Sequence, residues 1–211
     1  GEMIASALTK RLGKPIKWIE DRRENYVATS HGRDHIDYVD VAAKSDGTIT
    51  GLRVTAYANM GAYLSTAGPG VPTWLFGLIL SGPYKIPNID CQVFGVVTNT
   101  TTTDAYRGAG RPEATYILER VIDLLAKRTG LDPVEIRRRN FIPKDEFPYT
   151  VATTLEYDSG DYDAALDKAL AMVGYEDLRR EQEELRKQGR YLGIGFSTYV
   201  EVCGLAPSNA A

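Results

Sequence analysis

The chain has 211 residues, and its 25 lysines and arginines against 28 aspartates and glutamates give a net charge of −3. Because the two signs are interspersed and no long apolar run or signal peptide is present, we expect a soluble cytoplasmic protein that binds neither nucleic acid nor an anionic membrane. The two cysteines, Cys91 and Cys203, are far apart and are expected to be buried free thiols in a reducing compartment.

The first quarter of the chain is predicted to form two helices and a strand. Residues 1–13 form a helix that Gly13 ends, because glycine readily adopts the left-handed conformation at a helix C-terminus. Residues 15–20 alternate like a strand, and residues 21–26 begin a short helix with Asp21 as its N-cap.

A β-hairpin follows, formed by residues 35–44 and 49–58. Asp46-Gly47 lies between them, and this pair favours the type of tight turn that matches the twist of the two flanking strands. Residues 59–87 contain several glycines and prolines, which indicates a long packed loop with a short helix at residues 74–80.

The second half of the chain is predicted to be mainly helical. Residues 93–99 form a buried strand that leads into a glycine-rich turn. From Glu113 to about Arg128 apolar residues recur every three or four positions, which predicts an amphipathic helix. Further helices are expected over residues 132–140, 161–173 and 175–188, and a strand over residues 191–202. Together these elements predict an α+β fold with mixed sheets and packed helices.

The turn before the long helix is the strongest candidate for a functional site. It places Arg107 and Arg111 beside Gly108 and Gly110, and Pro112 suits the first helical turn. Bare amides and fixed positive charge at a helix N-terminus favour an anionic group. The alternative is a structural helix start in which both arginines pair with nearby carboxylates. A dinucleotide-binding loop is disfavoured, because position 113 is glutamate where that motif needs a third glycine.

Other candidate sites are weaker. His31 and His35 have a spacing that would suit a metal on a helix, but Gly32 and the alternation after His35 favour a solvated loop that leads into an edge strand. Arg137-Arg138-Arg139 lies at a helix C-terminus, where basic residues favour the helix dipole. Glu201 is either a buried acid or an exposed strand residue.

The turn resembles the active-site loop of a known enzyme family. Residues 105–114, Ala-Tyr-Arg-Gly-Ala-Gly-Arg-Pro-Glu-Ala, are similar to that loop in the large subunit of the molybdenum hydroxylases, which include xanthine dehydrogenase, aldehyde oxidase and aerobic carbon monoxide dehydrogenase. The similarity continues, in the same order, through residues 14–22, 131–142, 157–162 and 193–196.

The resemblance implies specific roles for individual residues. Arg107 would stabilise the negative charge that develops while a molybdenum-bound hydroxide attacks the substrate. Phe141 and Phe196 would enclose a flat substrate, and Ser197 would contact it. The cofactor contacts would come from Arg139, Gly108, Ala109 and Gly110, with no residue bound directly to the metal.

The resemblance also implies that residues 1–211 are an internal fragment of a molybdopterin-binding domain, with a sub-boundary near residues 142–160. The family's Gly-Gly-Phe-Gly cofactor loop would lie upstream of Gly1, and its catalytic glutamate would lie downstream of Ala211. We therefore expect the isolated fragment to be inactive. The alternative is a non-catalytic module for subunit assembly.

The implied parent enzyme oxidises an aldehyde or an N-heterocycle with oxygen from water, using molybdenum-molybdopterin in the cytosine dinucleotide form. Its [2Fe-2S] clusters and FAD would reside on partner subunits, an iron-sulfur subunit and an FAD subunit. Carbon monoxide dehydrogenases proper carry a copper-bearing cysteine directly after the loop arginine, whereas this chain has Gly108. The resemblance therefore does not extend to the oxidation of carbon monoxide.

Overall fold

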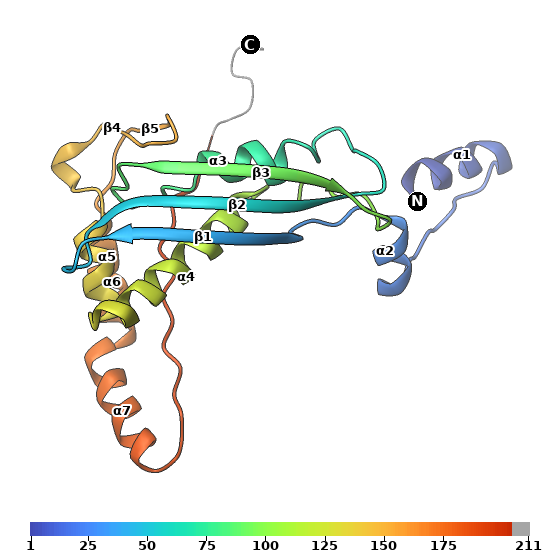
Figure 1. Ribbon diagram of the computed structural model, residues 1–211. Helices are drawn as coiled ribbons and strands as arrows, with labels where there is room; N and C mark the ends of the chain where they lie inside the picture. Colours follow the sequence, from blue (N-terminus) through green and yellow to red (C-terminus); the bar gives the residue numbers. More distant parts are fainter. Residues whose placement is uncertain (204–211) are drawn as a thin grey trace.

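The computed structural model describes residues 1–203, which form a three-stranded sheet, helices on one of its faces and a helical extension (Figure 1). The strands are β1 (His35–Ala43), β2 (Ile49–Gly61) and β3 (Ile89–Val97). β1 and β2 pair antiparallel, whereas β2 and β3 pair parallel. The predicted α+β class is confirmed.

The β1–β2 hairpin forms at the predicted turn. Gly47 has a φ of 88°, and the Asp46 carboxylate accepts a hydrogen bond from the Thr48 amide at 2.9 Å. Asn140 reaches this turn from a helix: its side chain accepts from the Ile49 amide at 2.8 Å and donates to the Gly47 carbonyl at 3.0 Å. The turn is therefore stabilised by its own Asp46 and Gly47 and by the side-chain amide of Asn140, which is distant in the sequence.

The parallel partner β3 is reached through a long crossover. The crossover contains η1 (Val71–Leu75), a single π-helical turn, and α3 (Phe76–Leu78). These elements occupy the region where the sequence predicted a short helix at residues 74–80. Phe76 is fully buried, so the crossover packs against the sheet and is not a surface loop.

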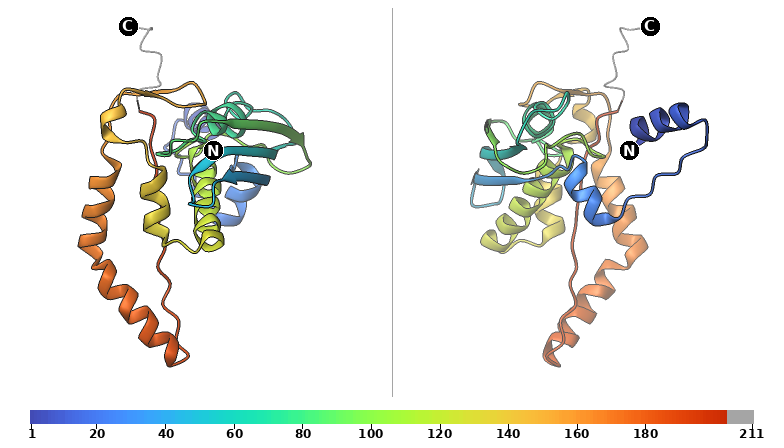
Figure 2. Two further views of the ribbon diagram at one scale, coloured as in Figure 1. Left: turned by 60° about the vertical axis from the view of Figure 1, so that its left-hand side comes forward. Right: turned by 90° about the vertical axis from the view of Figure 1, so that its right-hand side faces the viewer.

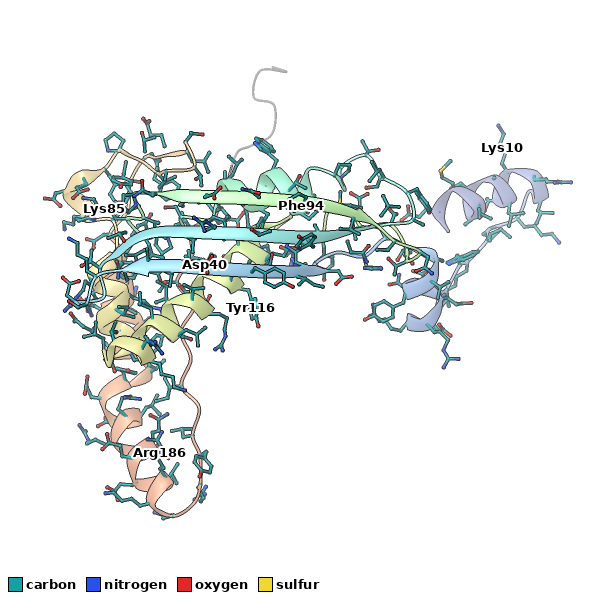
Figure 3. All side chains as sticks on the ribbon, viewed as in Figure 1. Lys10, Asp40, Lys85, Phe94, Tyr116 and Arg186 are labelled. Carbon is teal, nitrogen blue, oxygen red and sulfur yellow. The ribbon has the colours of Figure 1, made fainter. Side chains whose placement is uncertain are left out.

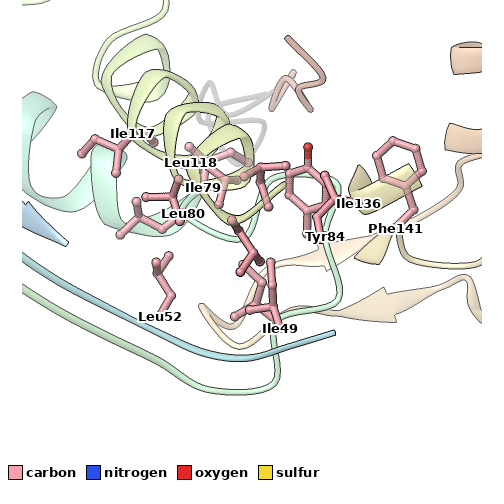
Figure 4. Close-up of a cluster of buried hydrophobic side chains, with 14 of the residues drawn as sticks. Ile49, Leu52, Ile79, Leu80, Tyr84, Ile117, Leu118, Ile136 and Phe141 are labelled. Carbon is pink, nitrogen blue, oxygen red and sulfur yellow. The ribbon is translucent and has the colours of Figure 1, made fainter. Parts of the chain in front are cut away.

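Two further helices complete the core. They are α4 (Arg111–Thr129) and α5 (Pro133–Asn140), both at the predicted positions. The hydrophobic core combines β2, the crossover, α4 and α5 (Figure 4). Its buried members include Phe76, Ile79, Leu80, Tyr84, Ile86, Leu118, Ile122, Ile136, Phe141 and Ile142.

The opposite face of the sheet is uncovered. Tyr38, Tyr57 and Phe94 form an aromatic row across all three strands, with ring centroids 6.3 Å and 5.3 Å apart, and Figure 3 labels Phe94 in this row. Phe94 is 48% exposed. The prediction that residues 93–99 form a buried strand is therefore wrong in its burial: β3 is an edge strand of this sheet, covered on one face.

The remaining elements lie around this core, and three of them contribute the buried side chains of Tyr157, Leu166 and Tyr175 to it (Figures 1 and 2). They are α1 (Glu2–Leu12), α2 (Arg22–Ala28), η2 (Lys144–Glu146), β4 (Tyr149–Thr150), β5 (Glu156–Tyr157), α6 (Tyr162–Val173) and α7 (Tyr175–Lys187). α1 buries no residue and ends at Gly13, as predicted. The predicted sub-boundary near residues 142–160 falls on η2 and the β4–β5 hairpin. None of the helices in residues 1–203 is long and apolar enough to cross a membrane.

Two predicted strands are not formed. Residues 15–20 and 191–202 are extended but pair with no strand among the described residues. Residues 192–202 nevertheless alternate between half-buried and exposed, as in a strand. Alternation of apolar and polar residues indicates only that an extended segment has one buried and one exposed face. A strand also needs a neighbouring strand whose backbone groups form hydrogen bonds with its own.

Candidate functional site

The arginine-glycine loop begins where two distant segments meet. His31 and Thr103 form an isolated parallel bridge, and the Asp104 amide donates to the His31 carbonyl at 3.0 Å. The loop then continues through Arg107 to the first turn of α4. The predicted context of strand, turn and helix is therefore present.

Three consecutive residues of this loop have positive φ. The angles are 94° at Gly108, 44° at Ala109 and 87° at Gly110. A Cβ atom at Gly110 would collide with the carbonyl oxygen of Val71 and lie 2.8 Å from the amide nitrogen of Phe76. Glycine is therefore required at position 110 by both conformation and space.

The loop is closed by its own hydrogen bonds. The Ala109 amide donates to the Tyr106 carbonyl at 2.7 Å, and the Arg111 Nε donates to the Gly108 carbonyl at 2.6 Å. Pro112 lies in the first turn of α4, where a missing amide hydrogen costs nothing. The positive end of the helix dipole thus lies beside Gly108 and Gly110.

Arg107 differs from its basic neighbours in having no partner. Arg111 pairs with Glu201 at 2.7 Å, and Arg33 lies 3.9 Å from Glu113. The side chain of Arg107 is exposed, and within residues 1–203 no hydrogen bond or ion pair engages its guanidinium. The structural alternative, in which both loop arginines pair with carboxylates, holds for Arg111 and fails for Arg107.

The three residues expected to contact substrate meet at one cavity. Phe141, Phe196 and Ser197 line a space of about 670 Å³ between the residue 192–199 segment and helices α6 and α7. Most of the other lining side chains are apolar: Pro83, Tyr162, Ala165, Leu166, Ala169, Leu170, Val173, Tyr175, Leu178, Leu192, Ile194 and Tyr199. Such a lining suits a flat apolar ligand.

Both phenylalanines also have structural contacts. Phe141 is 4% exposed and stacks on Tyr84 with ring centroids 5.6 Å apart. Phe196 meets Tyr175 edge to face at 5.4 Å, and the Arg137 guanidinium lies 5.3 Å from its centroid. The interpretation of these rings as core residues therefore remains valid beside their place on the cavity wall.

Ser197 connects the cavity with the loop region. It also lines a smaller cavity of about 360 Å³, together with Arg111, Tyr116 and Glu201. Arg111 additionally donates to the Val202 carbonyl at 2.7 Å. The residue after the loop and the segment that carries Ser197 are thus held together.

The position of this segment depends on a buried charge network. The Glu119 carboxylate accepts from Arg137 Nη2 at 2.9 Å and from the Thr198 amide at 2.9 Å. Arg137 also bonds Asp123 at 2.9 Å, and the Tyr84 hydroxyl donates to Glu119. These bonds tie Thr198 to α4 and α5. Because Ser197 is the preceding residue, its position is fixed with that of Thr198.

The network has consistent electrostatics. Burial opposes the charge of Arg137, but Tyr84, Glu119 and Asp123 outweigh it, so the pKa of the guanidinium is raised. Burial and the charge of Glu119 raise the pKa of the Tyr84 hydroxyl, which keeps it protonated as a donor. Each charge in the network is therefore paired, as burial requires.

Arg137 differs from the other two arginines at the C-terminus of α5. Its side chain is fully buried and ion-paired, in addition to lying where a basic residue favours the helix dipole. Arg138 and Arg139 both lie on the surface. The sequence could not separate the three, since only the packing of α5 on α4 decides which one points inward.

Arg139 is not brought to the Arg107 loop. Its guanidinium bonds Glu135 at 2.7 Å and the carbonyl of Asp46, at the turn of the β1–β2 hairpin. This turn and the start of α4 lie at opposite ends of α4 (Figure 1). The cofactor role predicted for Arg139 would require it to exchange these bonds.

The histidine pair has a different environment from the expected one. His35 lies in β1 with its side chain 5% exposed, and its ring meets Phe76 edge to face at 5.0 Å. Asp37 lies 3.5 Å away. His35 begins the edge strand β1, as predicted, but its side chain is buried against Phe76, and the described residues contain no cluster of three potential metal ligands.

Sequence reasoning did not identify Arg33, which contacts the loop at several points. It donates to the carbonyl of Arg107, and its guanidinium lies 4.7 Å from the centroid of the Tyr106 ring. No pattern in the sequence links residue 33 to residue 107. The isolated bridge that brings them together exists only in the folded chain.

Comparison with known proteins gives consistent results. The family model for the molybdopterin cofactor-binding domain matches residues 1–141. The carbon monoxide dehydrogenase large chain of Hydrogenophaga pseudoflava is 45% identical over 99% of this chain and 26% of its own length. The nicotine 6-hydroxylase large subunit of Paenarthrobacter nicotinovorans is 38% identical over 96% of this chain and 25% of its own length.

Solved structures show the same similarity. Quinoline 2-oxidoreductase from Pseudomonas putida 86 superposes with a TM-score of 0.79 at 32% identity, covering 89% of this chain and 24% of that one. The Cu,Mo-CO dehydrogenase in its carbon monoxide reduced state superposes with a TM-score of 0.75 at 37% identity and the same coverage. The chain thus spans about a quarter of the length of the relatives that it matches.

Proposed function

We propose, from the premise that this chain belongs to the molybdenum hydroxylase family of xanthine dehydrogenase, aldehyde oxidase and carbon monoxide dehydrogenase large subunits, that it supplies part of the active site of such an enzyme. The parent oxidises an aldehyde or an N-heterocycle with oxygen from water. Residues 1–211 alone do not turn over, because the site is completed by residues outside them.

The observation that carries this proposal is the unpaired guanidinium of Arg107. The other two arginines at this loop, Arg111 and Arg33, each face a carboxylate. An exposed cation without a partner, on a loop fixed by glycines that admit no side chain, suits an anionic ligand or a developing negative charge. Arg107 is therefore assigned the role of stabilising that charge.

The loop also fits a molybdenum-pterin group. Gly108, Ala109 and Gly110 present backbone without large side chains at the N-terminus of α4, where the helix dipole favours the phosphate of a cofactor. When bound, the group supplies the redox chemistry that amino acids lack. We assign these three residues to cofactor contact; Arg139 stays a weaker assignment, because Glu135 and Asp46 engage it.

The substrate class follows from Gly108. Its φ is 94°, and a Cβ atom there would lie 2.5 Å from Pro112 Cγ. A cysteine at this position, as in the copper-bearing relatives, would meet both backbone strain and the rigid proline ring. This supports an organic substrate over carbon monoxide.

The cavity at Phe141, Phe196 and Ser197 supports a flat organic substrate. Two rings and a hydroxyl face a space of about 670 Å³, which is within the usual range for small-molecule sites. Electrons would leave through [2Fe-2S] and FAD on an iron-sulfur subunit and an FAD subunit, and the pterin would be the cytosine dinucleotide form.

A non-catalytic assembly module is the second candidate, and the uncovered aromatic row of Tyr38, Tyr57 and Phe94 favours it. Molybdenum and cyanide-labile sulfur, measured in the longest native polypeptide that contains this chain, separate the two. Near-stoichiometric amounts of both support the hydroxylase. A folded native product without either would remove the catalytic proposal and leave the assembly module.

A further inference from the structure

Arg33 has an unusual backbone conformation for an arginine. Its φ is 68°, in the left-handed region where non-glycine residues carry a conformational cost. The residues around it are fixed on both sides: His31 bridges Thr103, and the Asn59 side chain donates to Asp34 at 2.8 Å. Such a conformation persists where the surroundings determine it, and here it directs the side chain towards the arginine-glycine loop.

The Arg33 side chain touches this loop at three points. It donates to the carbonyl of Arg107, it lies 4.7 Å from the Tyr106 ring centroid, and its Nε is 3.9 Å from Glu113. These contacts span the loop from the residue before Arg107 to the first turn of α4. One side chain thus bridges the whole segment that contains the three positive φ angles.

The hydrogen bond from Arg33 to the Arg107 carbonyl acts on the residue to which we assign charge stabilisation. A hydrogen bond to a charged donor is stronger than a neutral one, and it fixes the plane of the peptide that leaves Arg107. That peptide joins Arg107 to Gly108, so the bond restrains the backbone on which the Arg107 side chain is carried. Displacements of about 1 Å in a positioned group can cost about 100-fold in rate.

The contact with Glu113 has a second effect. Glu113 Oε2 is buried and has no hydrogen-bond partner among the described residues, so the charge of Arg33 is its nearest compensation. The charge of Arg33 therefore links its side chain to the first turn of α4 as well as to the loop.

We propose that Arg33 is a positioning residue for Arg107: it fixes the Arg107 peptide and connects it with the first turn of α4. The catalytic consequence rests on the function proposed above. The structural consequence, that Arg33 orders residues 104–110, does not depend on it.

The test uses Arg33→Asn in the full-length polypeptide, because asparagine tolerates the left-handed conformation and lacks the guanidinium that makes all three contacts. Arg53→Asn is the control: Arg53 is an exposed arginine that pairs with Asp90 on the sheet, away from the loop. The first readout is hydrogen exchange of the Ala109 amide, measured without cofactor. We expect exchange at least 10-fold faster in Arg33→Asn and unchanged in Arg53→Asn. Equal exchange in all three proteins would overturn the proposal.

The second readout is turnover of the cofactor-loaded enzyme. We expect kcat to fall about 10- to 100-fold in Arg33→Asn with a smaller change in KM, and millimolar guanidinium to restore part of the loss. In an Arg107→Ala background, Arg33→Asn should have little further effect on kcat. A fall of equal size in that background would overturn the positioning role.

The two readouts separate the proposals. Faster exchange in Arg33→Asn, combined with unchanged turnover in Arg107→Ala, would remove Arg107 from the mechanism and keep Arg33 as the residue that orders the loop. Unchanged exchange, combined with a large effect of Arg107→Ala, would keep the proposed function and reject Arg33.

Discussion

Two arginines of this chain have opposite environments. Arg137 is fully buried, and its guanidinium bonds Glu119, Asp123 and the Pro133 carbonyl. Arg107 is exposed, and no group within residues 1–203 engages its guanidinium. One arginine thus links structural elements through ion pairs, whereas the other has no ion pair among the described residues.

Under the proposed function, the two arginines divide stability and function between them. A buried cation must be paired, so Arg137 joins α4, α5 and the Thr198 segment into one unit. An unpaired exposed cation contributes little to folding and is free to act on a ligand. If this separation holds, changes at the two arginines should affect different measurements.

The largest effect is expected for Arg137→Ala. It leaves the Glu119 carboxylate buried without its cation, which should lower the free energy of unfolding by about 3–5 kcal/mol. Arg139→Ala, two residues away and on the surface, should cost under about 1 kcal/mol. Urea denaturation of the variants measures both. Similar losses in the two variants would show that burial does not distinguish them.

The next effect is catalytic. Arg107→Ala in the full-length enzyme should lower kcat by about 100-fold or more, because charge stabilisation is lost at the reacting centre. The free energy of unfolding should change by no more than about 0.5 kcal/mol, as for most surface substitutions. Steady-state kinetics and denaturation together check this. A variant with normal turnover and reduced stability would reverse the assignment of the two regions.

A smaller effect is expected at the edge of the buried region. Burial, followed by the hydrogen bond to Asp132, raises the pKa of Tyr175 to about 12 from 10.0. The folded protein keeps this proton where the unfolded chain loses it, so the contribution is complete below pH 10 and is lost as the pH rises towards 12.

The comparison of Tyr175→Phe with the wild type isolates this contribution, because other buried tyrosines titrate in both proteins. The variant should be about 1 kcal/mol less stable at neutral pH. The stability difference should shrink as the pH is raised above 10. A difference that stays constant up to pH 12 would mean that Tyr175 is not protected by its burial.

The smallest effect concerns the two cysteines. Both were predicted to be buried, but Cys91 is only half-buried and Cys203 is exposed. Burial, and then the charges of Asp90 and Asp37, raise the pKa of Cys91 to about 11, whereas Cys203 is exposed. Only the thiolate reacts, so at pH 8 a thiol reagent should label Cys203 at least about 10-fold faster than Cys91. Mass spectrometry of the labelled protein reads both rates, and denaturant should equalise them.

Local signals in the sequence predicted much of the fold. Asp21 and Asp132 cap helices as expected, and Gly13 ends α1 in the left-handed conformation. The Asp46-Gly47 turn and the long helix after Pro112 are confirmed. Each of these features is specified by residues within a few positions of one another.

The features that could not be predicted depend on distant parts of the chain. The residue 191–202 segment alternates like a strand, but the described residues provide no strand beside it. Arg137 is buried because α5 packs on α4, and Arg33 reaches Arg107 because His31 bridges Thr103. The loop was found from its own sequence, whereas the residues that support it were visible only in the folded chain.

The parallel pairing of β3 has a consequence for the order of folding. The β1–β2 hairpin closes over a short turn and can form within microseconds, whereas β3 must wait for residues 62–88 to close a long loop. Residues 104–110 lie after β3 in the chain, so we predict that they become ordered late. Pulse-labelled hydrogen exchange during refolding should protect the Thr55 amide, which faces β1, before the Ala109 amide; the opposite order would contradict this. The reactive loop would then be assembled only on a scaffold that has already formed.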